Sequence, residues 1–274
     1  MTYPLSNLHT HTTFCDGRNT PEEMVGRAIE LKWESIGFSG HAYMPCEPRY
    51  SMSLDGMSAY FNEITRLKAK YEGIIDIYLG VEQDVFSPDP EFACDYKIGS
   101  AHYLNIGNLY PAVDDSPEIA ENTVISCFGG DWYKYAEAYY ELAAKAAEIT
   151  GCDIVGHFDL LTKFNEGGRY FNEDDRRYRH AALGAMEHEV KYCRLFEINT
   201  GAIYRGRRSV PYPSEFLLRN LADMGAQVIL SSDSHDAASL GWRFEDAAYL
   251  AARCGFRYLS VLRKGKFEQV KLGL

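Results

Sequence analysis

The sequence lacks the cysteine patterns that would make thiols central to its fold or chemistry. Its seven cysteines are widely spaced and odd in number, and no Cys-x-x-Cys occurs. These spacings give no sign of a disulfide framework. We therefore expect reduced thiols, as in a cytosolic protein.

Segments that would direct the chain to or through a membrane are also missing. No run of eighteen apolar residues occurs, so no membrane span is predicted. The segment Met1–Leu5 has no basic flank followed by a long apolar run, so no signal peptide is expected. There is no Asn-x-Ser/Thr acceptor for glycosylation either. A cytoplasmic location is the prediction.

Positive charge is scarce, with 28 Lys and Arg against 39 Asp and Glu and a net charge of −11. Nucleic-acid binding depends largely on basic residues that neutralise phosphates, so this balance disfavours a nucleic-acid partner. It also disfavours attraction to anionic membranes. A small-molecule phosphate remains the expected partner, and the oligomeric state stays open.

What the chain does contain is an alternation of short apolar runs with helical patterns. Alternation of this kind is typical of an α/β protein with a mainly parallel sheet. No repeat or linker interrupts it, so we expect one domain over residues 1–274. The predicted strands cover 5–9, 35–39, 74–81, 96–100, 153–156, 195–198 and 227–231.

The predicted helices lie between these runs. Thr20, Pro21 and Glu23 form a capping box with proline in the first turn, which predicts a helix start. Further helices are expected over 57–71, 132–150, 174–192, 213–224 and 244–254, and a short last strand over 258–262. The segments 44–56 and 103–130 are expected to be irregular.

Histidines and carboxylates gather where the predicted strands end. The residues at or just past these ends are His9, His41, Glu82, His102, His157, Asp233 and His235. In an α/β barrel the active site is built at that face, and closure brings all strand ends around one cavity. An open sheet would hold the outer ones too far apart. We therefore predict a distorted, TIM-like (β/α)7 barrel.

Divalent metal binding is the chemistry that this cluster favours. His9 and His11 are two apart, so both imidazoles can face one side of a strand. A lone His-x-His is more often an ordinary surface or core feature, but six of the eight histidines lie at strand ends here. Imidazole with carboxylate suits zinc, manganese or iron and does not suit calcium.

Seven motifs follow one another over about residues 7–235. They are His9-Thr10-His11 with Cys15-Asp16-Gly17, Gly40-His41, Gly80-Val81-Glu82, Gly99-Ser100-Ala101-His102, Gly156-His157-Phe158-Asp159, Glu197-Ile198-Asn199-Thr200 and Ser232-Asp233-Ser234-His235. Together and in this order they resemble the motifs of the polymerase and histidinol phosphatase (PHP) family, in its histidinol-phosphatase branch.

The resemblance implies a distorted seven-stranded barrel with three divalent ions. By position, the first ion would take His9, His11, Glu82 and Asp233, and Glu82 would bridge to a second ion. The second would add His102 and His157, and the third would take Asp16, His41 and His235. A metal-bridging hydroxide would then attack phosphorus. The residues expected to act in catalysis are His9, His11, Asp16, Glu82, Asp233 and His235.

Substrate contacts are predicted more loosely. An arginine fork matches phosphate geometry, and the loop after the sixth strand offers Arg205 first and Arg207 next. Lys163 and Arg169 are weaker candidates. Residues that could line the pocket or meet a cationic substrate, each with an ordinary structural role as the alternative, are Phe14, Tyr43, Tyr103, Asp84, Asp159 and Glu166.

The resemblance implies a phosphatase that converts L-histidinol phosphate to L-histidinol and phosphate in histidine biosynthesis. Three alternatives stay open at this point. The chain could be a PHP phosphoesterase acting on another small phosphate ester or a nucleotide, a nuclease of the polymerase-associated type, or a non-catalytic metal-binding module.

Overall fold

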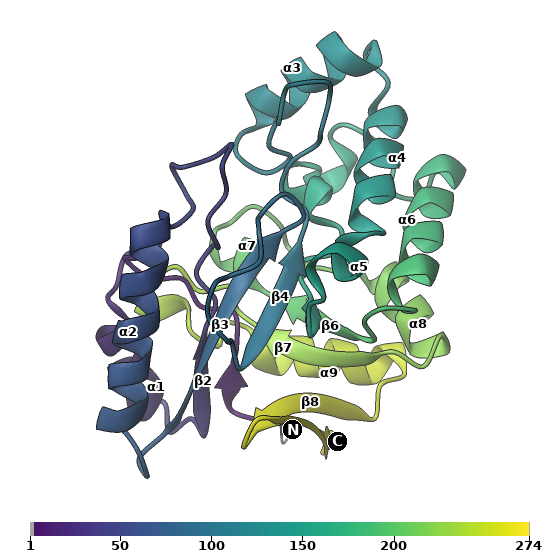
Figure 1. Ribbon diagram of the computed structural model, residues 1–274. Coiled ribbons are helices and arrows are strands. Elements are labelled where there is room, and N and C mark those ends of the chain that lie inside the picture. The colour runs from purple at the N-terminus through teal and green to yellow at the C-terminus, as the bar shows by residue number, and fades with distance from the viewer. Residues whose placement is uncertain (1–2, 274) are drawn as a thin grey trace.

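A computed structural model describes residues 3–273 and contains a seven-stranded parallel barrel (Figure 1). The strands pair in chain order, from β1 through β7. The sheet closes past the ends of β1 and β7, where Ser234 donates its N–H to the His9 carbonyl (3.1 Å) and accepts from the His11 N–H (2.8 Å). The predicted distorted barrel is thus confirmed. The strands are β1 (Ser6–Asn7), β2 (Ser35–Phe38), β3 (Asp76–Asp84), β4 (Tyr96–Ser100), β5 (Ile154–Val155), β6 (Leu195–Asn199) and β7 (Gln227–Ser231).

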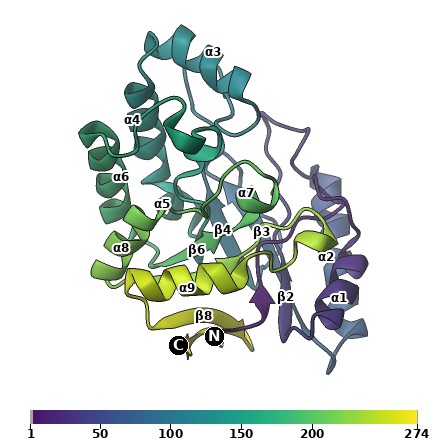
Figure 2. The same ribbon diagram turned by 180° about the vertical axis from the view of Figure 1, so that it is seen from behind.

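Helices surround this barrel on its outside (Figures 1 and 2). The first begins as the sequence predicts, because the Thr20 hydroxyl accepts from the Glu23 N–H and the Glu23 carboxylate accepts from the Thr20 N–H. The α-helices are α1 (Pro21–Glu30), α2 (Leu54–Lys70), α3 (Pro117–Phe128), α4 (Trp132–Ala143), α5 (Ala146–Thr150), α6 (Arg176–Glu189), α7 (Gly201–Tyr204), α8 (Glu215–Asp223) and α9 (Phe244–Cys254). The 3₁₀ helices are η1 (Leu160–Phe164), η2 (Glu166–Gly168) and η3 (Ala237–Ser239).

One aromatic side chain links strands across the barrel interior below the strand ends. Tyr96 of β4 is buried, and its hydroxyl donates to the Leu8 carbonyl on the opposite wall. Its ring needs Gly37 and Gly80, because a Cβ on Gly80 would lie 2.4 Å from the Tyr96 ring and one on Gly37 would lie 2.5 Å from its hydroxyl. These contacts fix the distance between β1 and β4 directly beneath the strand ends.

An antiparallel hairpin lies at the other end of the barrel, beside both termini (Figure 1). The predicted last strand over 258–262 is present as β8 (Tyr258–Arg263). Its partner β9 (Lys266–Lys271) was not predicted, because the sequence Lys-Phe-Glu-Gln-Val-Lys is polar and mostly exposed. The inward side chains of β8, Leu259 and Val261, are buried.

The prediction that residues 103–130 are wholly irregular is wrong. They include α3, which lies beyond the carboxyl ends of the strands (Figure 1). Pro117 occupies the first turn rather than breaking the helix, and the Ser116 side chain accepts from the Ile119 N–H as its cap. Gly129 ends the helix with φ of 64°.

Two helix boundaries also differ from the prediction. Residues 132–150 form α4 and α5 rather than one helix, with a break at Ala144–Lys145. The helix expected over 57–71 begins three residues earlier, at Leu54, because the Ser53 side chain accepts from the Gly56 N–H as a cap. Within residues 3–273, no helix has the length and apolar character needed to cross a membrane.

One buried carboxyl in this scaffold lies away from the histidine cluster. Glu189 of α6 is fully buried, and one of its oxygens accepts the Ala147 N–H (2.8 Å) at the start of α5. Its other oxygen has no hydrogen-bond partner among the described residues. Burial raises the pKa of Glu189 to about 8, so the folded protein holds this carboxyl in its neutral form below that pH.

We expect Glu189→Gln to remove a pH-dependent loss of stability. The folded pKa lies above the ordinary value of 4.5, so the stability associated with the neutral form is complete below pH 4.5 and is lost as pH rises through 8. Relative to the variant, the wild-type free energy of unfolding should fall by up to about 1.4 kcal/mol per pH unit across that range. Denaturant unfolding of both proteins at pH 5 and pH 8.5 measures the difference, and an equal difference at both values would contradict the assignment.

Candidate metal centre

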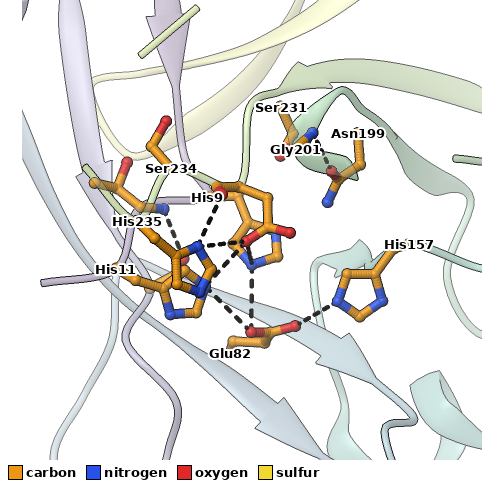
Figure 3. Close-up of polar contacts among 12 residues, drawn as sticks. His9, His11, Glu82, His157, Asn199, Gly201, Ser231, Ser234 and His235 are labelled. Carbon is orange, nitrogen blue, oxygen red and sulfur yellow. Dashed lines mark hydrogen bonds and ion pairs between the residues drawn. The ribbon is translucent and has the colours of Figure 1, made fainter. Parts of the chain in front are cut away.

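The predicted histidines and carboxylates come together at the carboxyl mouth of the barrel. Figure 3 shows His9, His11, Glu82, His157 and His235 among them. His9 and His11 follow β1, and both rings lie against the end of β3. The backbone of His41 forms a parallel bridge with Glu82, which extends the sheet past β2. The remaining members follow β4, β5 and β7 and are His102, His157, Asp233 and His235.

Glu82 lies at the centre of this cluster, and its two oxygens face different imidazoles. Its Oε2 lies 3.3 Å from Nε2 of His9, 3.5 Å from Nε2 of His11 and 3.0 Å from Nδ1 of His41. Its Oε1 lies 3.3 Å from Nε2 of His102 and 2.9 Å from Nε2 of His157. The carboxylate is therefore placed to join two groups of nitrogen donors.

Two further carboxylates, Asp233 and Asp16, lie beside His11. Oδ1 of Asp233 lies 3.3 Å from Nε2 of His11 and 3.6 Å from Nε2 of His9. Oδ2 of Asp16 lies 3.0 Å from Nε2 of His235 and 3.8 Å from Nε2 of His41. The side chains of Asp16, His41 and His235 are partly exposed, whereas Asp233, His9 and His11 are buried.

The donor atoms form four overlapping groups in which all atoms lie within 4.8 Å of one another. Four inward-facing atoms are buried with no hydrogen-bond partner among residues 3–273: Nε2 of His9, Nε2 of His11, Oε2 of Glu82 and Oδ1 of Asp16. Buried polar groups are rarely left without partners, so these atoms fit divalent cations. The groups are His11, Asp16, His41 and His235; His9, Glu82 and His157; His9, His11 and Asp233; and His41, Glu82 and His102.

Charge within the cluster is balanced between imidazoles and carboxylates. Burial by itself would raise the pKa of Glu82, but His9, His102 and His41 hold it well below its usual value. Burial would likewise lower the pKa of His9, but Glu197 and Glu82 raise it well above its usual value. Cations bound here would take over the positive charge that protons otherwise supply, so binding should release protons.

Carboxylates and polar side chains outside the cluster hold several ligand candidates in place. Oε2 of Glu197 lies 2.8 Å from Nδ1 of His9. Oδ2 of Asp84 accepts the backbone N–H of His102 (2.8 Å) and lies 3.1 Å from its Nδ1. The sequence did not predict that Glu197 and Asp84 contact ligand candidates. A charged residue within a buried strand, such as Glu197 in Leu195–Asn199, is a sequence feature that could have indicated such a contact.

A cavity of about 250 Å³ opens onto the exposed side of the cluster. Arg205 lines it and donates from Nη2 to Oδ2 of Asp233 (2.8 Å) and from Nη1 to the Asp233 carbonyl (3.1 Å). Lys163 also lines it, paired with Asp114 at 2.9 Å. The other acidic lining residues are Asp16, Glu47, Glu82, Asp84, Asp115 and Asp233.

Several predicted substrate contacts do not line this cavity. Arg207 is exposed, with its guanidinium 5.9 Å from the centre of the Phe164 ring. Arg169 pairs with Glu121 on the surface. Of the three aromatic candidates, only Tyr103 is a lining residue. The others outside the lining are Phe14, Tyr43, Asp159 and Glu166.

Comparison with known proteins identifies relatives of this chain in sequence and in structure. The PHP domain matches residues 7–201. A protein named probable histidinol-phosphatase from Deinococcus radiodurans is 30% identical over 89% of this chain and 91% of its own length. One of the same name from Schizosaccharomyces pombe is 27% identical over 96% of this chain and 90% of its own.

A solved structure has the same fold. Histidinol phosphate phosphatase from Lactococcus lactis, crystallised with zinc, L-histidinol and phosphate, superposes with a TM-score of 0.67 at 21% identity. The match covers 96% of this chain and 98% of that one. With its family profile matched over most of its length and its ligand candidates gathered at one barrel mouth, this chain belongs to the PHP domain family.

Proposed function

We propose that this protein is a metal-dependent phosphomonoesterase that hydrolyses L-histidinol phosphate to L-histidinol and phosphate in histidine biosynthesis. The observation that carries the proposal is Glu82, which faces five imidazoles beside a cavity that Arg205 also lines. Relatives named for this activity cover nearly the whole chain. The Lactococcus lactis structure holds zinc, L-histidinol and phosphate on the same fold.

The proposed cofactors are three divalent ions, of zinc, manganese or iron. Glu82 would join two of them because each of its oxygens faces a different set of imidazoles. When bound, the ions would supply an activated water at neutral pH and neutralise charge on the phosphoryl oxygens. The proposed ligands are His9, His11, Asp16, His41, Glu82, His102, His157, Asp233 and His235.

Arg205 is the proposed phosphate contact supplied by a side chain. It lines the cavity, and its Nε has no hydrogen-bond partner among the described residues. Its other nitrogens hold Asp233, one of the proposed ligands. A phosphoryl group that met Arg205 would therefore lie next to the ligand cluster, as the reaction requires.

The cavity wall farther from the cluster suits a substrate with a cationic end. Glu47 and Asp115 line it, and both bind Arg49, which is more than half exposed. Asp114 lines it as well, and Lys163 and His102 keep its pKa below the usual value although burial opposes this. Carboxylates outnumber cations here, which favours an amine-bearing phosphate over a nucleotide.

The seven cysteines are free, which suits the proposed cytoplasmic location. The proposed partner is a small phosphate ester. The net charge of −11 gives no basis for a nucleic-acid partner.

The substrate is tested by phosphate release from a panel at pH 7.5 with added zinc or manganese. We expect kcat/KM for L-histidinol phosphate to exceed that for p-nitrophenyl phosphate and nucleoside monophosphates by about 100-fold or more, because ionic and hydrogen-bond contacts to the amine add to phosphate binding. The matched control is the phosphate ester of the analogue that lacks the amino group. Equal kcat/KM values across the panel would reject histidinol phosphate as the substrate.

The central carboxylate is tested by Glu82→Gln. An amide can offer an oxygen to only one of the two sets of imidazoles, so we expect fewer bound ions per chain and a loss of activity of about 100-fold or more. Elemental analysis after dialysis and steady-state kinetics measure both effects. Chelation of the wild-type protein should abolish activity, and divalent metal should restore it. Full metal content with full activity in the variant would contradict the central role.

The contributions of Arg205 and Arg207 to phosphate binding are compared by the same substitution at each position. Arg205→Lys keeps the charge but removes the fork, so kcat/KM for phosphate monoesters should fall by about 10–100-fold. Arg207→Lys changes an exposed side chain outside the cavity. It should change kcat/KM for the same esters by less than about twofold. The reverse ranking would return the phosphate contact to Arg207.

A further inference from the structure

Glu197 connects three strands at the mouth of the barrel without being among the proposed ligands. It belongs to β6 and is fully buried. Its Oε2 lies 2.8 Å from Nδ1 of His9, after β1. Its Oε1 accepts the backbone N–H of His157, after β5, at 2.6 Å and the side-chain amide of Asn199 at 2.8 Å. Both oxygens are therefore engaged by donors of this chain.

The contact with His9 decides which ring nitrogen is available inside the cluster. A carboxylate oxygen accepts a hydrogen bond, so Nδ1 of His9 must carry the proton that it shares with Glu197. Nε2 then faces Glu82 at 3.3 Å and Asp233 at 3.6 Å. That atom has no hydrogen-bond partner among the described residues, as expected of a metal-binding nitrogen.

We propose that Glu197 is a positioning residue of the metal centre, whose carboxylate holds the His9 proton on Nδ1 and leaves Nε2 free to bind a divalent cation. This inference rests on the metal-binding role proposed above for His9. Through the His157 N–H, the same carboxylate also fixes the backbone of a second proposed ligand.

An amide could not take the place of this carboxylate. Glu197 receives three donors, two on Oε1 and one on Oε2. A glutamine that kept its oxygen on the His157 N–H and Asn199 would turn its NH2 toward Nδ1 of His9. The His9 ring would then have to accept at Nδ1 and carry its proton on Nε2, the atom that faces the cations.

Asp84 gives a useful contrast, because it binds a proposed ligand in a different pattern. Its Oδ2 receives both the N–H and Nδ1 of His102, whereas its Oδ1 receives only the Phe86 N–H (2.9 Å). An asparagine here can keep its oxygen on His102, at the cost of the Phe86 hydrogen bond, because its NH2 and the Phe86 N–H are both donors. The proton of His102 would then stay on Nδ1.

The test is the zinc affinity of Glu197→Gln, measured by competition with a chromophoric chelator and by elemental analysis. We expect at least one ion to be held about 10–100-fold more weakly than in the wild type. Glu189→Gln is the matched control, since it makes the same substitution at another fully buried carboxyl outside the cluster, and its zinc affinity should equal that of the wild type. Circular dichroism of the metal-free proteins checks that each variant is folded.

Asp84→Asn provides the second variant and should lose less zinc affinity than Glu197→Gln. Equal or greater loss would show that lost negative charge, rather than the proton position on His9, sets the affinity, and would overturn the proposal. So would wild-type affinity in a folded Glu197→Gln protein. Neutron diffraction from zinc-loaded wild-type crystals needs no variant, and a proton on Nε2 of His9 would likewise reject it.

These outcomes are distinct from failure of the proposed function. If the protein binds zinc as described but does not hydrolyse histidinol phosphate faster than other esters, the proposed substrate is rejected. The proposed role of Glu197 is unaffected by that result. Selective hydrolysis of histidinol phosphate with unchanged zinc affinity in Glu197→Gln would reject the role of Glu197 alone.

Discussion

The carboxylate of Glu82 is a negative charge held almost entirely out of water, and the architecture of this protein is built around neutralising it. A buried carboxylate without partners would take up a proton, because burial disfavours the charged form. Five imidazoles from four segments of the chain prevent this by lying within 3.5 Å of its oxygens. They can do so only if the strands close into a barrel, since an open sheet would separate β1 from β5.

Closure in turn depends on what fills the barrel below the cluster. Tyr96 spans the interior from β4 to Leu8, and the absence of a Cβ at Gly37 and Gly80 makes room for its ring and hydroxyl. A larger residue at either glycine would displace Tyr96 and with it the wall that carries His9. The packing of the barrel interior and the geometry of the polar centre therefore depend on each other. Small residues in the strands help to determine where the imidazoles meet.

The sequence predicted that these side chains would lie together because the signal for their positions is local. A histidine or carboxylate directly after an apolar run marks a strand end, and in a parallel barrel all such ends share one face. The direction of a side chain in a loop has no comparable signal. Arg205 and Arg207 are two residues apart, but the turn at Gly206, with φ of 64°, directs one toward the cavity and the other to solvent. Helix α3 and strand β9 were not predicted for a related reason, since neither has a strong apolar periodicity.

Exposure varies across the cluster, and this gradient limits where substrate can approach. The side chains of His9 and His11 are 0% exposed, whereas those of His41 and His235 are 21% and 24% exposed. The cavity reaches the cluster on the side of Asp16, His41 and His235, where Arg205 also lies, and this is the side open to a phosphate ester. The buried side is left to hold the proposed ligands in place, which explains why Glu197, the carboxylate on Nδ1 of His9, lies behind the cluster and not in the cavity.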